Sequence, residues 1–139
     1  MLISTRGRYA LRIMLDLAAH QSEGYIAMKH VADRQGLSLK YVEKIMPVLS
    51  RSRYVVGVHG KGGGYQLARS PQEYRVGDIL RLAEGDLAPV ACLSCSAEKC
   101  ERAPHCPTLP MWKEFHSMVN NYFDGITLAD LMTQNNPTL

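Results

Sequence analysis

The sequence predicts a mainly α-helical chain with one small β-hairpin and a long C-terminal helix. Three observations support this fold class. Apolar residues recur at helical spacing in several segments, two short β-branched runs flank a glycine-rich stretch, and aromatic residues mark one face of a helix near the C-terminus. The chain has 139 residues, of which 46% are hydrophobic. That length and composition allow one packed domain of ordinary size, or a small domain with an appended arm.

Capping residues and helix breakers delimit the N-terminal helices. Gly36 can adopt the left-handed conformation that ends a helix. Ser38 is a good N-cap for the helix that follows it. Pro47 removes a backbone donor and is expected to kink that helix or end its regular part early. The predicted helices cover about residues 4–20, 28–35 and 38–52.

The second part of the chain begins with the hairpin. Residues 54–58 and 65–68 are predicted strands, and the glycine-rich segment 59–64 between them is a mobile tip. A short helix is expected at about 76–84. A longer helix at about 111–124 is followed by a capping-box pattern at Thr127–Asp130 that starts a last helical turn. The seam spacing typical of packed helices is found at Trp112, Phe115, Val119 and Tyr122.

The order of these elements is that of a winged helix-turn-helix followed by a long C-terminal helix, and the family resemblance given below implies that this is a dimerisation helix. We expect residues 1–70 to form a DNA-binding domain and residues 71–90 a connecting helix. Residues 91–107 form a cysteine-rich sensor loop, and residues 108–134 hold the dimerisation helix and the final helical turn.

Charge is divided unevenly along the chain. Residues 1–70 hold 11 Lys and Arg against 4 Asp and Glu, a net charge of +7, whereas residues 71–139 hold 5 against 9, a net charge of −4. A basic half of this kind indicates contact with a polyanion such as double-stranded DNA. No apolar run approaches the ~20 residues that cross a bilayer, and the N-terminus does not resemble a signal peptide, so a cytoplasmic location is expected.

The candidate DNA contacts lie on the third helix, in the hairpin tip and at the start of the first helix. A recognition helix enters the major groove N-terminus first, so polar residues should crowd its first turns. Lysines there can meet phosphate or guanine, and Glu43 can accept a hydrogen bond from cytosine. The predicted DNA-contacting residues are Arg6, Ser38, Lys40, Tyr41, Glu43, Lys44, Arg51, His59, Gly60, Lys61, Gly62 and Gly63.

All four cysteines lie within one 15-residue stretch, as Cys92, Cys95, Cys100 and Cys106. A tight cluster in a chain without a signal peptide indicates a metal or redox site, not a disulfide framework. Thiolates are strong ligands for iron–sulfur clusters and zinc. Only one Cys-x2-Cys pair is present, so an iron–sulfur cluster is favoured over structural zinc. No pattern of catalytic residues supports an enzyme.

Several motifs together resemble the IscR/NsrR/CymR family of bacterial regulators, also called the Rrf-two family. The resemblance covers nearly the whole chain. It is carried by residues 3–10, 35–38 with 41–43, the wing residues 62–67, residues 76–79 and residues 126–131. It implies a homodimeric winged-helix DNA-binding protein, usually a repressor, with the long C-terminal helices crossed at the dimer interface. It also implies that Ser38, Lys40, Tyr41, Glu43 and residues 59–63 face DNA.

The resemblance further implies that Cys92, Cys100 and Cys106 hold a two-iron or four-iron cluster. Family members take a fourth ligand from positions that are Leu109, Arg8 or Arg12 in this chain. None of these three is a suitable ligand, so Cys95 is the predicted fourth ligand, with His105 behind it. Two alternatives stay open. The cysteines are an oxidant sensor through disulfide formation, or the regulator senses a metabolic protein partner.

Overall fold

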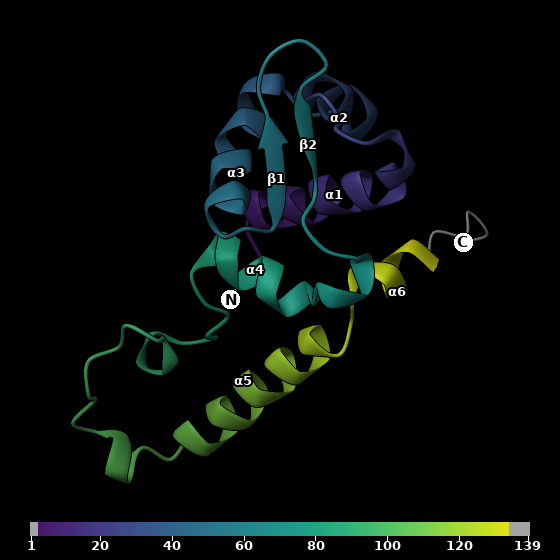
Figure 1. Ribbon diagram of the computed structural model, residues 1–139. Helices are drawn as coiled ribbons and strands as arrows, with labels where there is room; N and C mark the ends of the chain where they lie inside the picture. The colour runs from purple at the N-terminus through teal and green to yellow at the C-terminus, as the bar shows by residue number, and fades with distance from the viewer. Residues whose placement is uncertain (1–2, 134–139) are drawn as a thin grey trace.

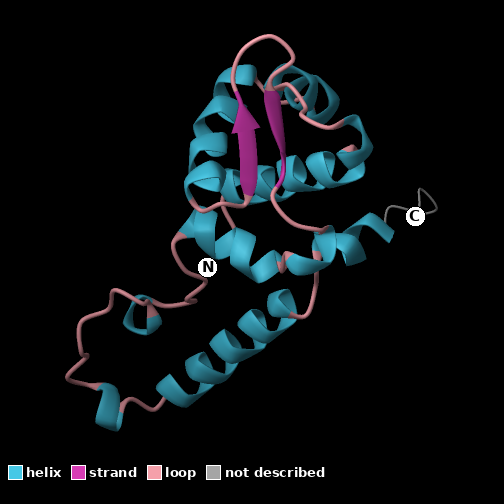
Figure 2. Cartoon of the chain, viewed as in Figure 1, coloured by secondary structure: helices cyan, strands magenta, loops and turns pink. Residues whose placement is uncertain are grey.

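A computed structural model describes residues 3–133, and its mainly helical architecture with one hairpin confirms the predicted fold class (Figures 1 and 2). The parts of the predicted segments at residues 1–2 and 134 lie outside the described residues. No helix within 3–133 is long and apolar enough to cross a membrane. The helices are α1 (Thr5–Ala19), α2 (Met28–Gln35), α3 (Leu39–Arg51), α4 (Val76–Glu84), α5 (Leu109–Asp124) and α6 (Leu128–Thr133), and the strands are β1 (Val55–Val58) and β2 (Gly64–Leu67). Short 3-10 turns occur at Gln21–Glu23, Pro71–Glu73, Ala91–Leu93 and Ala103–His105.

The helix boundaries follow local chemistry. Gly36 has φ 64° and closes α2 in the left-handed conformation, where a side chain would add strain. Ser38 caps α3 by accepting a hydrogen bond from the Tyr41 amide at 3.2 Å. Of the two expected effects of Pro47, an early end of the helix is wrong, because α3 continues through Pro47 to Arg51, close to the predicted end at residue 52. Pro47 lies on the exposed side of α3, where its ring does not disturb the core.

The hairpin is joined to the helical part at its base. Strands β1 and β2 pair antiparallel with Val55 opposite Leu67, and Tyr65 forms a further bridge to Ile26 ahead of α2. Tyr74, which is buried, donates a hydrogen bond to the Tyr54 carbonyl at 2.7 Å. The base of the wing is therefore fixed, and only its tip projects (Figure 1).

The main core lies where α1, α2, α3 and the hairpin base meet. Ile13 and Met14 of α1 are fully buried there, together with Val42 of α3. A second, smaller cluster forms around Leu80 of α4 and Leu87, with Val119 and Phe123 of α5 packed against it. One apolar side of α5 is thus covered by its own chain, while Figure 1 shows the rest of α5 projecting from the body.

Helix α5 begins two residues earlier than expected, at Leu109. Pro110 lies in its first turn, where a missing backbone donor costs nothing. The predicted capping box is confirmed at the start of α6. The Thr127 amide donates to Asp130 at 2.9 Å, and the Asp130 amide donates to the Thr127 hydroxyl at 3.1 Å.

An ion pair between the buried Asp16 and the more exposed Arg34 joins α1 to α2. Asp16 is 3% exposed and accepts hydrogen bonds from Arg34, at 2.7 and 3.0 Å, and from Gln35, at 3.0 Å. Burial raises the pKa of Asp16, but the hydrogen bonds from Arg34 and Gln35 outweigh it, so the net pKa is lowered. The carboxylate fixes the C-terminal end of α2, directly before the turn into α3.

Replacing Arg34 by alanine should destabilise the fold by about 3 kcal/mol at pH 7, because it leaves a buried carboxylate without its cation. Since the folded pKa of Asp16 is depressed, its stabilisation is complete above the unfolded value of about 3.9 and is lost as the pH falls through the folded pKa. Urea unfolding of wild type and Arg34→Ala, at equal protein concentration and several pH values, measures this. The difference should shrink below about pH 4. A difference independent of pH would show that the ion pair is not its source.

Candidate DNA interface and cysteine loop

Helix α3 presents two chemically different faces. Its apolar residues Val42, Ile45, Met46 and Leu49 are buried in the core. The opposite face exposes Lys40, Glu43, Lys44 and Arg51. The predicted division between core and polar positions on α3 therefore agrees with the observed burial. The first turns of the helix offer two cations and one hydrogen-bond acceptor to a partner.

Tyr41 lies differently from the other predicted contacts on α3. It is half-buried, and its ring meets the edge of the Tyr9 ring with centroids 5.1 Å apart. The Arg12 guanidinium lies 5.3 Å from the centroid of Tyr9. Tyr41 therefore helps to fix the position of α3 on α1, and only part of its side chain is accessible.

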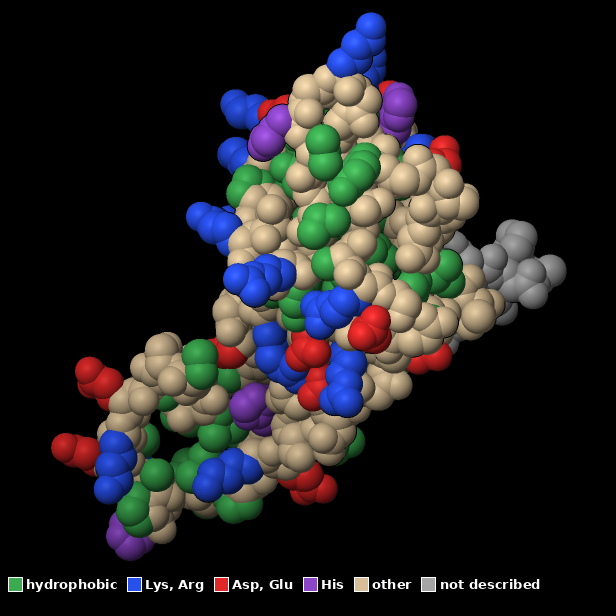
Figure 3. Space-filling view, in the orientation of Figure 1, with side chains coloured by type: hydrophobic (Ala, Val, Ile, Leu, Met, Phe, Trp, Pro, Cys, Tyr) green, Lys and Arg blue, Asp and Glu red, His purple; other side chains and the backbone are tan. Residues whose placement is uncertain are grey.

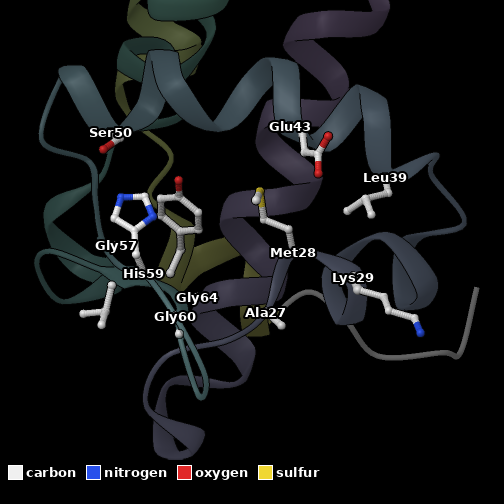
Figure 4. A pocket seen from close by; sticks show the side chains of 13 residues that line it. Ala27, Met28, Lys29, Leu39, Glu43, Ser50, Gly57, His59, Gly60 and Gly64 are labelled. Atoms are coloured by element: carbon white, nitrogen blue, oxygen red, sulfur yellow. The ribbon is translucent and has the colours of Figure 1, made fainter.

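A groove of about 390 Å³ separates α3 from the wing. Figure 4 shows Glu43 of α3, Met28 of α2 and His59 of the hairpin approaching it from three elements. Gly60, Gly63 and Gly64 line the hairpin side of the groove. The structure thus brings α3 and the wing together around one concave surface.

The tip of the wing is exposed and rich in glycine. Gly60 has φ 93° and Gly62 has φ 77°, a region that other residues rarely adopt. His59 and Lys61 are exposed at this tip. Figure 3 shows Lys and Arg side chains at the hairpin tip and along the edge of the molecule formed by α3, whereas Asp and Glu gather more in the half that holds α5.

Arg6 is placed apart from this groove. It lines a small apolar hollow with Val48 and Leu49 of α3 and with Leu82 of α4. This position lies beside the C-terminal half of α3, toward Arg51 and away from the hairpin tip. Arg6 is exposed, so its predicted contact with DNA would be made with a flanking phosphate.

Sequence reasoning missed several residues that line the groove, among them Met28, Lys29 and Leu39. Lys29 stands in the first turn of α2, and the first helix of a helix-turn-helix crosses the DNA backbone, so that rule would have singled it out. Leu39 is 41% exposed although it is apolar, directly after the Ser38 cap. An apolar residue beside the core stripe of α3 is expected to be buried, so nothing in the sequence indicated that Leu39 lies on the exposed surface.

The cysteine loop runs from the end of α4 to the start of α5 and extends away from the winged domain (Figure 1). Cys92, Cys100 and Cys106 line one hollow of about 270 Å³, and Cys95 is not part of its lining. All four cysteines are free thiols. No three His, Cys, Asp or Glu side chains between residues 3 and 133 are already arranged as a metal-binding group.

Hydrogen bonds shape both ends of this loop. The Thr108 hydroxyl lies 3.4 Å from the Cys106 sulfur, and this contact lowers the pKa of the Cys106 thiol. At the other end Asp86 accepts from the Ser94 hydroxyl at 2.6 Å, the Ala88 amide at 2.9 Å and the Cys95 amide at 3.2 Å. The hydrogen bonds from Ser94 and Ala88 lower the pKa of Asp86 to about 2.

Comparison with known proteins agrees with this geometry. The chain matches the family described as Rrf2, iron-dependent transcriptional regulator, over residues 3–134. It is 34% identical over 135 residues to the HTH-type transcriptional regulator IscR of Aliivibrio salmonicida, covering 97% of this chain and 79% of that protein. It is 40% identical over 134 residues to protein rrf2 of Nitratidesulfovibrio vulgaris, covering 95% of this chain and 87% of that protein.

Solved structures show the same fold. CymR (YrzC), the global cysteine regulator of B. subtilis, superimposes with a TM-score of 0.80 at 34% identity, covering 98% of this chain and 99% of CymR. IscR of T. potens gives a TM-score of 0.76 at 34% identity, covering 98% of this chain and 89% of IscR. The family and the IscR and CymR relatives are transcriptional regulators, not enzymes, which agrees with the function predicted from the sequence. The chain is therefore a winged-helix, DNA-binding transcriptional regulator that belongs to the Rrf2 family.

Proposed function

We propose that the chain binds an operator in double-stranded DNA as a homodimer and represses transcription. In this proposal α3 enters the major groove and the hairpin tip enters the adjacent minor groove. The observation that carries it is the exposed polar face of α3 beside the glycine-tipped wing, with a groove of about 390 Å³ between them. Lys40 and Lys44 bind phosphate or guanine, and Glu43 accepts from cytosine. Ser38, Tyr41, Arg51, Arg6 and residues 59–63 complete the proposed contacts.

The proposed dimer interface is the uncovered side of α5. Met111, Phe115, Met118 and Tyr122 are 54%, 42%, 62% and 67% exposed and recur at spacings of four, three and four residues. The residue spacing places them on one stripe of the helix. Two of the four predicted seam positions, Trp112 and Val119, are instead half-buried in their own chain. Large apolar side chains clustered on one exposed face are typical of a surface that another protein covers.

Two recognition helices on one face of DNA must lie about 34 Å apart or a multiple of that distance. The proposed dimer helix α5 and the cysteine loop are consecutive in the chain, so the sensor adjoins the element that sets this spacing. We propose that residues 91–107 act as the sensor loop, between the winged domain of residues 1–70 with its connecting segment 71–90 and the dimerisation segment 108–134.

The proposed ligand of the sensor loop is an iron–sulfur cluster, two-iron or four-iron. The residues present fit it, because three thiols from separate turns of the loop line one hollow and thiolates are the usual ligands of such clusters. Cys92, Cys100 and Cys106 would hold the cluster, with Cys95 as the proposed fourth ligand. Cys95 would need to turn toward the hollow. When bound, the cluster supplies a redox-sensitive and iron-sensitive cross-link of the loop. Zinc is the second choice for the same donors.

Sensing by thiol oxidation without a cluster is the second candidate. It is favoured by the lowered pKa of Cys106 and by the exposure of Cys92, Cys95 and Cys100, because an accessible thiolate is the form that oxidants attack. A protein partner that reads metabolic state is a further alternative for the same fold. Iron and sulfide analysis of anaerobically purified protein separates the cluster from these alternatives.

The proposed DNA-binding face is tested by Lys44→Ala, with Arg75→Ala as the matched control. Lys44→Ala should weaken operator binding about tenfold and lower the salt slope by about one per protomer, because it removes one cationic contact. Arg75→Ala removes the same charge from an exposed site next to α4, and it should change neither quantity. Fluorescence anisotropy at several salt concentrations measures both. Equal losses in the two variants would show that net charge, not the α3 face, determines affinity.

A further inference from the structure

The end of α4 carries two carboxylates that hold different parts of the molecule. Glu84 accepts hydrogen bonds from the Ser4 amide at 2.9 Å and from the Ser4 hydroxyl at 2.6 Å. Two residues later, Asp86 accepts from Ser94 and Cys95 in the cysteine loop and from Ala88 just before it. The winged domain and the sensor loop are therefore tied to adjacent positions of one short segment.

Glu84 meets an electrostatic need at the start of α1. The first turn of this helix has no acidic residue, and it holds Arg6. A cation at a helix N-terminus is unfavourable, and a carboxylate there is favourable. The carboxylate of Glu84 lies over Gly7, where the oxygen would collide with any Cβ. Glu84 thus supplies from α4 the negative charge that α1 lacks.

The geometry between the two carboxylates is fixed by Gly85. This residue has φ 92° and ψ −52°, and its amide donates to the Arg81 carbonyl at 2.8 Å. No atom would contact a Cβ at this position, so its requirement for glycine is conformational and not steric. Arg81 itself binds Asp124 of α5 at 2.7 Å. Arg81 therefore joins the end of α4 to α5, and its carbonyl holds the amide of Gly85.

From α1 the contacts continue to the recognition helix. Arg12 of α1 binds the carbonyl and side chain of Gln35 at the end of α2, and Asp16 binds Arg34. Tyr9 of α1 packs against Tyr41 of α3. A displacement of the N-terminus of α1 can therefore be transmitted through these contacts to both α2 and α3.

We propose that Glu84, Gly85 and Asp86 form a coupling segment that transmits the state of the cysteine loop to α1 and through it to α3. Both carboxylates act as positioning residues. Order in the loop keeps Asp86 in place and supports the Glu84–Ser4 contact, and loss of that order weakens the start of α1. This inference rests on the proposed function, in which the loop senses and α3 binds DNA.

The test is hydrogen exchange in the full-length protein without DNA, at the amides of Ser4, Gly7 and Arg8 on one side and of Ala88 and Cys95 on the other. Asp86→Ala should accelerate exchange at residues 4, 7 and 8 about tenfold, as expected for loss of a charge-assisted hydrogen bond transmitted along the segment. Because coupling is reciprocal, Glu84→Ala should accelerate exchange at Ala88 and Cys95. The control Glu101→Ala removes an exposed charge from the same loop and should change neither side.

The proposed coupling is refuted if Glu84→Ala accelerates exchange only at residues 4, 7 and 8 and Asp86→Ala accelerates it only at Ala88 and Cys95. Should Asp86→Ala fail to fold, Ser94→Ala removes the loop donor while both carboxylates remain, and it must also accelerate exchange at residues 4, 7 and 8. If the wild-type protein binds operator DNA but each variant accelerates exchange only on its own side, this inference is refuted and the proposed function stands. Coupled exchange in a protein that shows no operator preference would support the coupling segment and refute the proposed function.

Discussion

Replacing Met118 by aspartate should convert the proposed dimer into monomers and weaken operator binding by about 10²–10⁴-fold. The methionine is 62% exposed in the central part of the uncovered stripe of α5. A charge there is solvated in a monomer but would be buried without a partner in a dimer. Each half-site would then bind alone, without the gain that two linked contacts provide.

Ser117→Asp is the matched control, because it adds the same charge one residue away on a different side of α5. Analytical ultracentrifugation and operator titration should find this control dimeric and of wild-type affinity. Both variants should keep the same helical content in far-ultraviolet circular dichroism, which would show that Met118→Asp is a folded monomer. A dimeric Met118→Asp protein with unchanged operator affinity would mean that α5 is not the interface.

Replacing Cys106 by serine should abolish the brown colour of anaerobically purified protein. Loss of a thiolate ligand should reduce cluster affinity by more than about 100-fold, since changes in supporting residues alone cost 10–100-fold. Cys92→Ser and Cys100→Ser should behave alike, because the three thiols line the same hollow. Cys95→Ser should also lose iron if this residue turns toward the hollow as proposed.

Iron and acid-labile sulfide per protomer, with an absorption spectrum, measure this effect. Ser96→Ala is the control, because Ser96 is an exposed loop residue whose oxygen is not a preferred cluster ligand. Wild-type protein that is colourless after anaerobic purification would contradict the cluster and favour thiol oxidation or a protein partner. Zinc in place of iron, lost on the same three substitutions, would assign the hollow to a different metal.

Local signals made most of the fold predictable. The bounds predicted for α2 and α4 agree with the structure because a glycine follows each of these helices and the apolar spacing is regular. Helix α5 begins before the predicted start at residue 111, because Pro110 suits the first turn of a helix and does not end the regular structure there. The expectation of an early end at Pro47 is wrong for a similar reason, since an exposed proline at this position is compatible with a continuing helix.

The site was predictable only where its residues are close in sequence. The cysteine cluster and the polar face of α3 each lie within one segment, so spacing was sufficient to find them. The Glu84–Ser4 hydrogen bond joins residues 80 positions apart, and no periodicity indicates such a contact. Likewise, Met28 and Leu39 are ordinary apolar residues in the sequence, and only the packing of α2, α3 and the wing places them along the groove.

The central claim is that the polar face of α3 and the wing recognise a particular DNA sequence. Its most direct test is to select duplexes from a random pool with the full-length protein. The selected duplex is then titrated at modest salt with random DNA as competitor. The account predicts a two-fold symmetric site bound at least about 10³-fold more tightly than random DNA, with half-sites one helical turn or a multiple apart. Equal affinity for selected and random duplexes, in a sample verified to be a dimer, would contradict it.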